Sequence, residues 1–96
     1  MINYVLMKVS VWDTYVPRKN GRSMHFDILV PSELQDPGTV FDYGREYLAT
    51  KPFWTGTLTA KECRFCHMET APPEVEASIL EKGFHIIEME NCNSFD

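Results

Sequence analysis

Residues 11–31, "VWDTYVPRKNGRSMHFDILVP", decide the fold of this 96-residue chain. Residues 4–16 alternate between apolar and polar types and are rich in β-branched and aromatic side chains, which is typical of a strand. The dipeptide Asn20-Gly21 is a strong signal for a hairpin turn. Residues 23–30 then read as the returning strand, which ends at a proline. The stretch therefore predicts an antiparallel β-hairpin.

A two-residue turn at Asn20-Gly21 would set the register of this hairpin, with Tyr15 opposite Phe26. Because side chains alternate along a strand, a slip of one residue would exchange the two faces, and the apolar pattern favours this register. One face then carries mostly apolar side chains, namely Val9, Val11, Asp13, Tyr15, Met24, Phe26, Ile28 and Val30. The other face carries Lys8, Ser10, Trp12, Thr14, Val16, His25, Asp27 and Leu29.

The less apolar face contains the candidate catalytic residues, because this register places His25 and Asp27 close to Trp12 and Thr14. A histidine and a carboxylate within reach of each other can perform acid–base chemistry on a small molecule. The simpler interpretation is a solvated face on which His25 and Asp27 only pair. Asp13 stands apart on the apolar face, so we expect it at the rim of the sheet or hydrogen-bonded internally.

Two helices and a last strand follow the hairpin. The first helix is predicted within residues 35–51. Asp36 is a good N-cap for it, and Pro37 suits the first helical position. Residues 72–83 end at Gly83, which suits the left-handed position after a helix. Residues 84–90, "FHIIEME", read as a strand.

These elements predict an α+β fold in a single domain over residues 1–96. We expect a mostly antiparallel sheet of about four strands with two main helices packed on it. Residues 1–6 and 93–96 are expected at the periphery. The second helix should bury Val75, Ile79 and Leu80, and Gly44 should be a close-packing position in the first.

Composition excludes several classes of function. The chain has 14 acidic and 9 basic residues and a net charge of −5, which disfavours a nucleic-acid partner. No window approaches the roughly 18 consecutive apolar residues of a membrane span. The N-terminus has neither the charged start nor the cleavage site of a signal peptide. With three cysteines, we expect a reducing cytoplasm and no disulfide framework.

The hexapeptide "ECRFCH" at residues 62–67 is the most chemically suggestive stretch. It follows "TAKE", residues 59–62, which matches a helical capping box. We therefore expect a helical turn from about residue 60 to residue 64, with a strand over about residues 65–70. Such a turn would bring Cys63 and Cys66 to one side, with His67 four residues from the first cysteine.

Four interpretations of this hexapeptide compete. Simple packing is favoured, because free cysteine is often buried as a small hydrophobe. A zinc site would use Cys63, Cys66, His67 and Cys92, or His85 in place of the last, but a second ligand pair at defined spacing is missing. A thioredoxin-like dithiol would lie at a helix N-terminus directly after a strand, and covalent haem attachment would need export. No cofactor is firmly implied.

The residues also resemble a known family. The segments "MKVSVWDTYVPRKNGRSMHFDILVP", "YGREYL", "LTAKECRFCHMETAPPEVE" and "GFHIIEMENC" are similar to a family of small bacterial proteins, the domain-of-unknown-function family 2024. The likeness covers about residues 7–92. It implies a compact α+β domain in the bacterial cytoplasm, and it supplies no catalytic residue.

Three hypotheses for the function follow. The first is a non-enzymatic binding or interaction domain that meets a protein partner or a second copy of the chain. The second is a small zinc-type metal-binding domain that uses the C-x-x-C-H stretch. The third is a small-molecule enzyme that uses His25 and Asp27.

Overall fold

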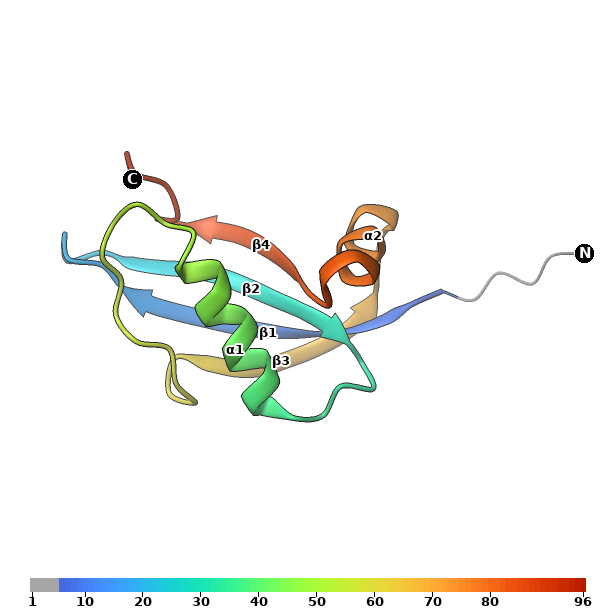
Figure 1. Ribbon diagram of the computed structural model, residues 1–96. Coiled ribbons are helices and arrows are strands. Elements are labelled where there is room, and N and C mark those ends of the chain that lie inside the picture. Colours follow the sequence, from blue (N-terminus) through green and yellow to red (C-terminus); the bar gives the residue numbers. More distant parts are fainter. Residues whose placement is uncertain (1–5) are drawn as a thin grey trace, which may run out of the picture.

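The computed structural model describes residues 6–96 as a four-stranded antiparallel sheet with a helix packed on each face (Figure 1). Along the chain the elements are β1 (Lys8–Pro17), β2 (Ser23–Pro31), α1 (Pro37–Leu48), β3 (Cys63–Thr70), α2 (Pro73–Lys82) and β4 (His85–Glu90). The strand order is β3-β1-β2-β4, and every neighbouring pair is antiparallel. The α+β fold predicted from the sequence is therefore confirmed. Of the first expected strand, residues 4 and 5 lie outside the described residues.

The register of the β1–β2 hairpin differs by one residue from the prediction. Tyr15 lies opposite His25, Asp13 lies opposite Asp27, and the first strand residue after the turn pairs with Pro17. The slip exchanges the two faces of β1 relative to β2. The face beneath α1 therefore combines Trp12, Thr14 and Val16 of β1 with Met24, Phe26, Ile28 and Val30 of β2.

A three-residue loop causes the slip. The N–H of Arg18 donates to the carbonyl of Arg22 over 2.8 Å, and the N–H of Gly21 donates to the carbonyl of Arg18 over 3.1 Å. Gly21 has a φ of 83°, and Asn91 is the only non-glycine residue with a positive φ in residues 6–96. The two-residue turn that Asn-Gly favours needs a positive φ at both residues. Asn20 does not have a positive φ, so the loop is not this turn.

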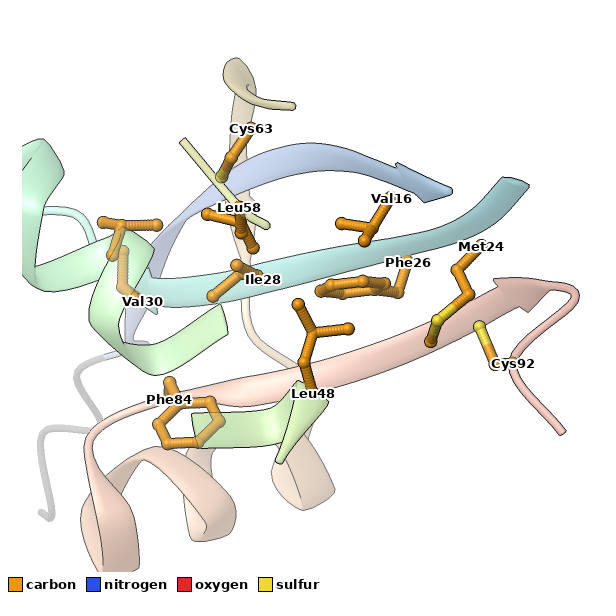
Figure 2. Packing of buried hydrophobic residues seen from close by; sticks show 11 residues of the cluster. Val16, Met24, Phe26, Ile28, Val30, Leu48, Leu58, Cys63, Phe84 and Cys92 are labelled. Carbon is orange, nitrogen blue, oxygen red and sulfur yellow. The ribbon is translucent and has the colours of Figure 1, made fainter. Parts of the chain in front are cut away.

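The main core lies between α1 and the sheet (Figure 2). Phe26, Ile28 and Val30 of β2 are fully buried there, and they pack with Val40 and Leu48 of α1. The helix begins as predicted, since the side chain of Asp36 accepts from the N–H of Gly38 over 3.1 Å.

A smaller core lies between α2 and the other face of the sheet. Val75 and Ile79 of α2 pack there on Val9, Val11 and Leu29. The helix ends as predicted at Gly83, whose φ of 93° is left-handed. The predicted burial of Leu80 is wrong, because its side chain is 72% exposed. Because each face of the sheet meets a helix, both faces of β1 and β2 carry apolar side chains.

The hairpin turn is held to the end of the chain by one buried cation. Nη1 of Arg18 donates to the carbonyl oxygens of Asn91 and Asn93 over 3.1 and 2.9 Å. The guanidinium also lies 3.8 Å from the ring centroid of Phe53, which packs against the main core. The neighbouring Trp54 is 61% exposed.

Gly44 is the close-packing position that the sequence suggested. A Cβ atom built there would lie 2.5 Å from Cδ1 of Leu58 and 2.9 Å from Cδ1 of Ile28. Both side chains are fully buried and have little room to move. We expect Gly44→Ala to lower the free energy of unfolding by about 1–2 kcal/mol, because overpacking outweighs the better helix propensity of alanine.

Urea denaturation of the Gly44→Ala variant measures this change, with Gly38→Ala in the same helix as the control. The Cβ atom added at Gly38 would meet nothing closer than 3.4 Å. Equal stability of the Gly44→Ala variant and the original protein would contradict the packing described for α1.

Candidate functional site

The part of the α2-facing side of the sheet nearest the hairpin turn carries the candidate site. Asp13 and Tyr15 of β1 lie here directly opposite Asp27 and His25 of β2, respectively. Alternation places these side chains on the same face as Val9, Val11 and Leu29, the residues that α2 covers farther along the strands. We call Asp13, His25 and Asp27 the acidic-histidine cluster.

The imidazole of His25 is the centre of this cluster. Its Nε2 lies 3.4 Å from Oδ1 of Asp13 and 3.9 Å from Oδ1 of Asp27. The ring of Tyr15 stacks on the imidazole with a centroid distance of 4.2 Å and an interplanar angle of 12°. This stacking fixes the plane of the ring, so that Nε2 stays directed at the two carboxylates.

Burial and mutual repulsion separate the acidities of the two carboxyl groups. Desolvation, together with the hydrogen bond and the negative charge of Asp13, raises the pKa of Asp27 to about 6. The hydrogen bond from Asp27 and the contact with His25 hold the pKa of Asp13 below its ordinary value. The pair therefore shares one proton in mildly acidic solution.

Oδ1 of Asp27 is a buried hydrogen-bond acceptor without a partner within residues 6–96. The nearest ring nitrogen, Nε2 of His25, is 3.9 Å away, which is too far for a hydrogen bond. Buried carboxylate oxygens normally accept a hydrogen bond or bind a cation. The cluster thus contains a buried acceptor that can take a further hydrogen bond or a cation.

The cluster can perform two kinds of chemistry. One ligand atom from each of its three residues lies within 4.8 Å of the others, which is the spacing of a metal-binding group. A carboxyl group with a pKa near 6 beside an imidazole can also exchange protons. A hollow of about 400 Å³ borders the cluster, lined by Asp13, Tyr15, Lys61, Glu62, Arg64, Phe65 and Cys66.

The predicted grouping of His25 and Asp27 with Trp12 and Thr14 is wrong, because the register places the last two on the α1 side. Thr14 is fully buried there, and its hydroxyl donates to Sγ of Cys63 over 3.3 Å. Trp12 packs edge-on against aromatic rings of α1 and β3.

The turn expected before the cysteines exists but is shorter than predicted. Oε1 of Glu62 accepts from the N–H and the hydroxyl of Thr59 over 2.7 and 2.6 Å, as a capping box requires. The turn covers residues 60–62 only, and β3 begins at Cys63. The two cysteines therefore lie in one extended strand rather than on one side of a helix.

The structure does not bring Cys63, Cys66, His67 and Cys92 together. Cys63 lies in the main core beside Leu58, and Cys92 lies near Met24 in the same core (Figure 2). These two residues are therefore packed as small hydrophobes, and all three cysteines are free thiols.

Cys66 and His67 remain neighbours of the acidic-histidine cluster. Nδ1 of His67 lies 3.3 Å from Sγ of Cys66, and its Nε2 lies 3.2 Å from Oε2 of Glu69. Partial desolvation and the negative charges of Asp13 and Asp27 raise the pKa of the Cys66 thiol. A thiol with a raised pKa is protonated at neutral pH, which argues against a reactive dithiol.

Sequence reasoning singled out Asp13 as a carboxylate at the rim or hydrogen-bonded internally, but it did not place this residue beside His25 and Asp27, and it gave Tyr15 no role at the site. Both were assigned to the apolar face by the expected two-residue turn. The available signal was the tripeptide "KNG" at residues 19–21, because a three-residue hairpin loop also ends on a left-handed glycine. That alternative register places Asp13 opposite Asp27 directly.

Comparison with known proteins agrees with the fold. The solved NMR structure of protein NE1680 from Nitrosomonas europaea superposes with a TM-score of 0.75 at 38% sequence identity. The match covers 91% of this chain and 100% of the other. No curated protein matches the sequence. Within residues 6–96, no helix is both long and apolar enough to cross a membrane.

A protein-family model confirms the resemblance found in the sequence. The model described as Domain of unknown function (DUF2024) matches residues 7–89, which is most of the chain. The segments that carried the resemblance, the hairpin and the cysteine stretch among them, all fall within or overlap this range. The chain therefore belongs to the DUF2024 family.

Proposed function

We propose that this protein is a small binding domain whose ligand is a divalent first-row metal ion. The acidic-histidine cluster, Asp13, His25 and Asp27, would supply one imidazole nitrogen and two carboxylate oxygens. The observation that carries the proposal is the buried Oδ1 of Asp27, which has no hydrogen-bond partner in residues 6–96 and lies 3.9 Å from Nε2 of His25.

The distances in the cluster suit such an ion. Zinc binds imidazole nitrogen and carboxylate oxygen at about 2.0–2.2 Å, so neighbouring ligand atoms of a tetrahedral site are about 3.3–3.5 Å apart. Nε2 of His25 is 3.4 Å from Oδ1 of Asp13 and 3.9 Å from Oδ1 of Asp27. A small rotation of the second carboxylate would complete three zinc ligands.

The charge of the cluster also favours a cation. Two carboxylates in mutual contact repel each other, and this repulsion contributes to the raised pKa of Asp27. A divalent cation would replace the shared proton and stabilise both ionised carboxylates. Three protein ligands would leave a coordination position at which a further ligand could bind.

The binding of Zn²⁺ to protein stripped with a chelator tests this proposal by calorimetry. We expect one equivalent to bind at pH 7.5. His25→Gln should lower the affinity by about a hundredfold, because it removes the imidazole ligand that the carboxylates share. His85→Gln is the matched control and should bind as the original protein does, since His85 is not part of the cluster.

A second variant separates this site from the cysteine stretch. The Cys66→Ser, His67→Gln double variant removes the exposed thiol and imidazole of that stretch, and we expect its zinc affinity to stay within about threefold. Loss of binding in this double variant, with binding retained in His25→Gln, would contradict the proposal. Failure of the original protein to bind Zn²⁺ or Mn²⁺ at millimolar concentration would also contradict it.

A further inference from the structure

One edge of the sheet is formed by β3, which pairs only with β1 among residues 6–96. At the two ends of this pairing, the carbonyl of Glu62 accepts from the N–H of Tyr15, and the N–H of Ala71 donates to the carbonyl of Met7. Hydrogen-bonded and non-hydrogen-bonded positions alternate from each end. Counting inward, Phe65 and Met68 direct their backbone N–H and C=O groups away from β1.

The outer edge of β3 is also apolar. Phe65 is 52% exposed and Met68 is 56% exposed. Both lie on the α1 side of the sheet, because their partners in β1 are Trp12 and Ser10. Unpaired backbone groups beside large exposed apolar side chains favour the addition of another strand.

The sequence of β3 is complementary to itself when it is read antiparallel. If Phe65 of one copy lies opposite Met68 of a second copy, Arg64 lies opposite Glu69 and Cys66 lies opposite His67. The register shift between Val11 and Trp12 of β1 adds one residue to β3 at this point. As a result, the two members of each opposed pair lie on the same face of the sheet, as cross-strand neighbours must.

We propose that two copies of this protein pair antiparallel along β3, with Phe65 opposite Met68 and Arg64 opposite Glu69 of the second copy. The two-fold axis would pass between Cys66 and His67. Each dimer would then hold two Arg–Glu pairs and two aromatic–thioether contacts, which stabilise cross-strand pairing. Arg64 forms no ion pair within residues 6–96, so its charge is free for this contact.

The opposite edge of the sheet is less suitable for pairing with a second copy. Its strand, β4, carries Glu88 and Glu90 and no basic residue except His85. Antiparallel pairing of two β4 strands would therefore place no lysine or arginine opposite a carboxylate, unlike the pairing of two β3 strands. Charge therefore selects β3 for the contact.

Sedimentation equilibrium over a wide concentration range tests the dimer. A chelator and a reductant in the buffer make the result independent of metal binding and of cysteine oxidation. We expect a monomer–dimer equilibrium whose association constant falls about tenfold in Arg64→Glu, because two attractive pairs become repulsive. Glu69→Arg should have the same effect.

Charge exchange provides the decisive variant. The double variant Arg64→Glu, Glu69→Arg restores opposite charges across the two-fold axis, and we expect its association constant to return to within about threefold of the original. Arg22→Glu and Glu81→Arg reverse charges away from β3 and serve as controls. Circular dichroism verifies that each variant is folded.

Three results would overturn this proposal. The protein could be a monomer at every concentration, or the dimer could be insensitive to both single reversals. The third is a double variant no tighter than the single ones, which would show that Arg64 and Glu69 do not face each other.

Discussion

Asp27→Asn is expected to raise the free energy of unfolding of the metal-free protein at pH 7 by about 1–2 kcal/mol. The carboxylate of Asp27 is desolvated and lies against Asp13, which raises its pKa from 3.8 to about 6. Ionising this group in the folded protein at pH 7 is therefore unfavourable. An asparagine keeps the shape of the side chain without the charge.

The pH dependence has a definite sign. A carboxyl group whose pKa is raised by folding binds its proton more tightly in the folded state, so its contribution is greatest below about pH 4 and falls as pH rises to about 6. The lowered pKa of Asp13 acts in the opposite direction, but this effect is confined to pH values below about 4 and leaves the window from pH 4 to pH 6 to Asp27. The Asp27→Asn variant should lack most of the fall between pH 4 and pH 6.

Urea denaturation with a chelator at several pH values measures both effects. The same variant should lose most of its zinc affinity, because a neutral amide replaces a carboxylate ligand. Asp42→Asn, on the exposed face of α1, is the control and should change the stability by no more than about 0.5 kcal/mol. A lower stability of Asp27→Asn at pH 7 would show that Asp27 is structural and would contradict the interpretation of the site.

Val16→Lys is expected to unfold most of the protein, whereas Tyr15→Lys should cost about 1 kcal/mol or less. Val16 is 0% exposed in the main core, and Tyr15 is 51% exposed on the other face. An unpaired ammonium group in the core costs several kcal/mol, which is comparable to the whole stability of a small domain. The lysine at position 15 reaches water and loses mainly the stacking on His25.

Circular dichroism and urea denaturation of the two variants distinguish the registers of the hairpin. The register expected from the sequence placed Tyr15 on the core face and Val16 on the opposite one, so it predicts the reverse order of stabilities. Tolerance of lysine at position 16 together with unfolding at position 15 would contradict the observed pairing.

Local signals predicted the secondary structure well. The cap at Asp36, the prolines that open both helices and the left-handed Gly83 each act within a few residues, so their effects can be read directly from the sequence. Gly44 was also identified correctly as a packing position. The α+β class and the antiparallel sheet followed from these elements and from the hairpin signal.

Contacts between distant residues were predicted less well. The capping box at Thr59 was correct, but pairing of β3 with β1 extends the strand back to Cys63 and leaves only one turn. The expected burial of Leu80 was wrong, because its side chain is 72% exposed. In each case, the missing information was the position of another element in space.

By itself, the sequence determined the elements and their order, because capping, turn and alternation patterns are local. Only the tertiary structure decided the hairpin register and the site that depends on it. Because α1 and α2 cover opposite faces, apolar side chains such as Phe26 and Leu29 lie on both sides of β2, and the alternation cannot select one face. The three-residue loop with the left-handed Gly21 sets the register of the hairpin. This register places Asp13 opposite Asp27 in the acidic-histidine cluster.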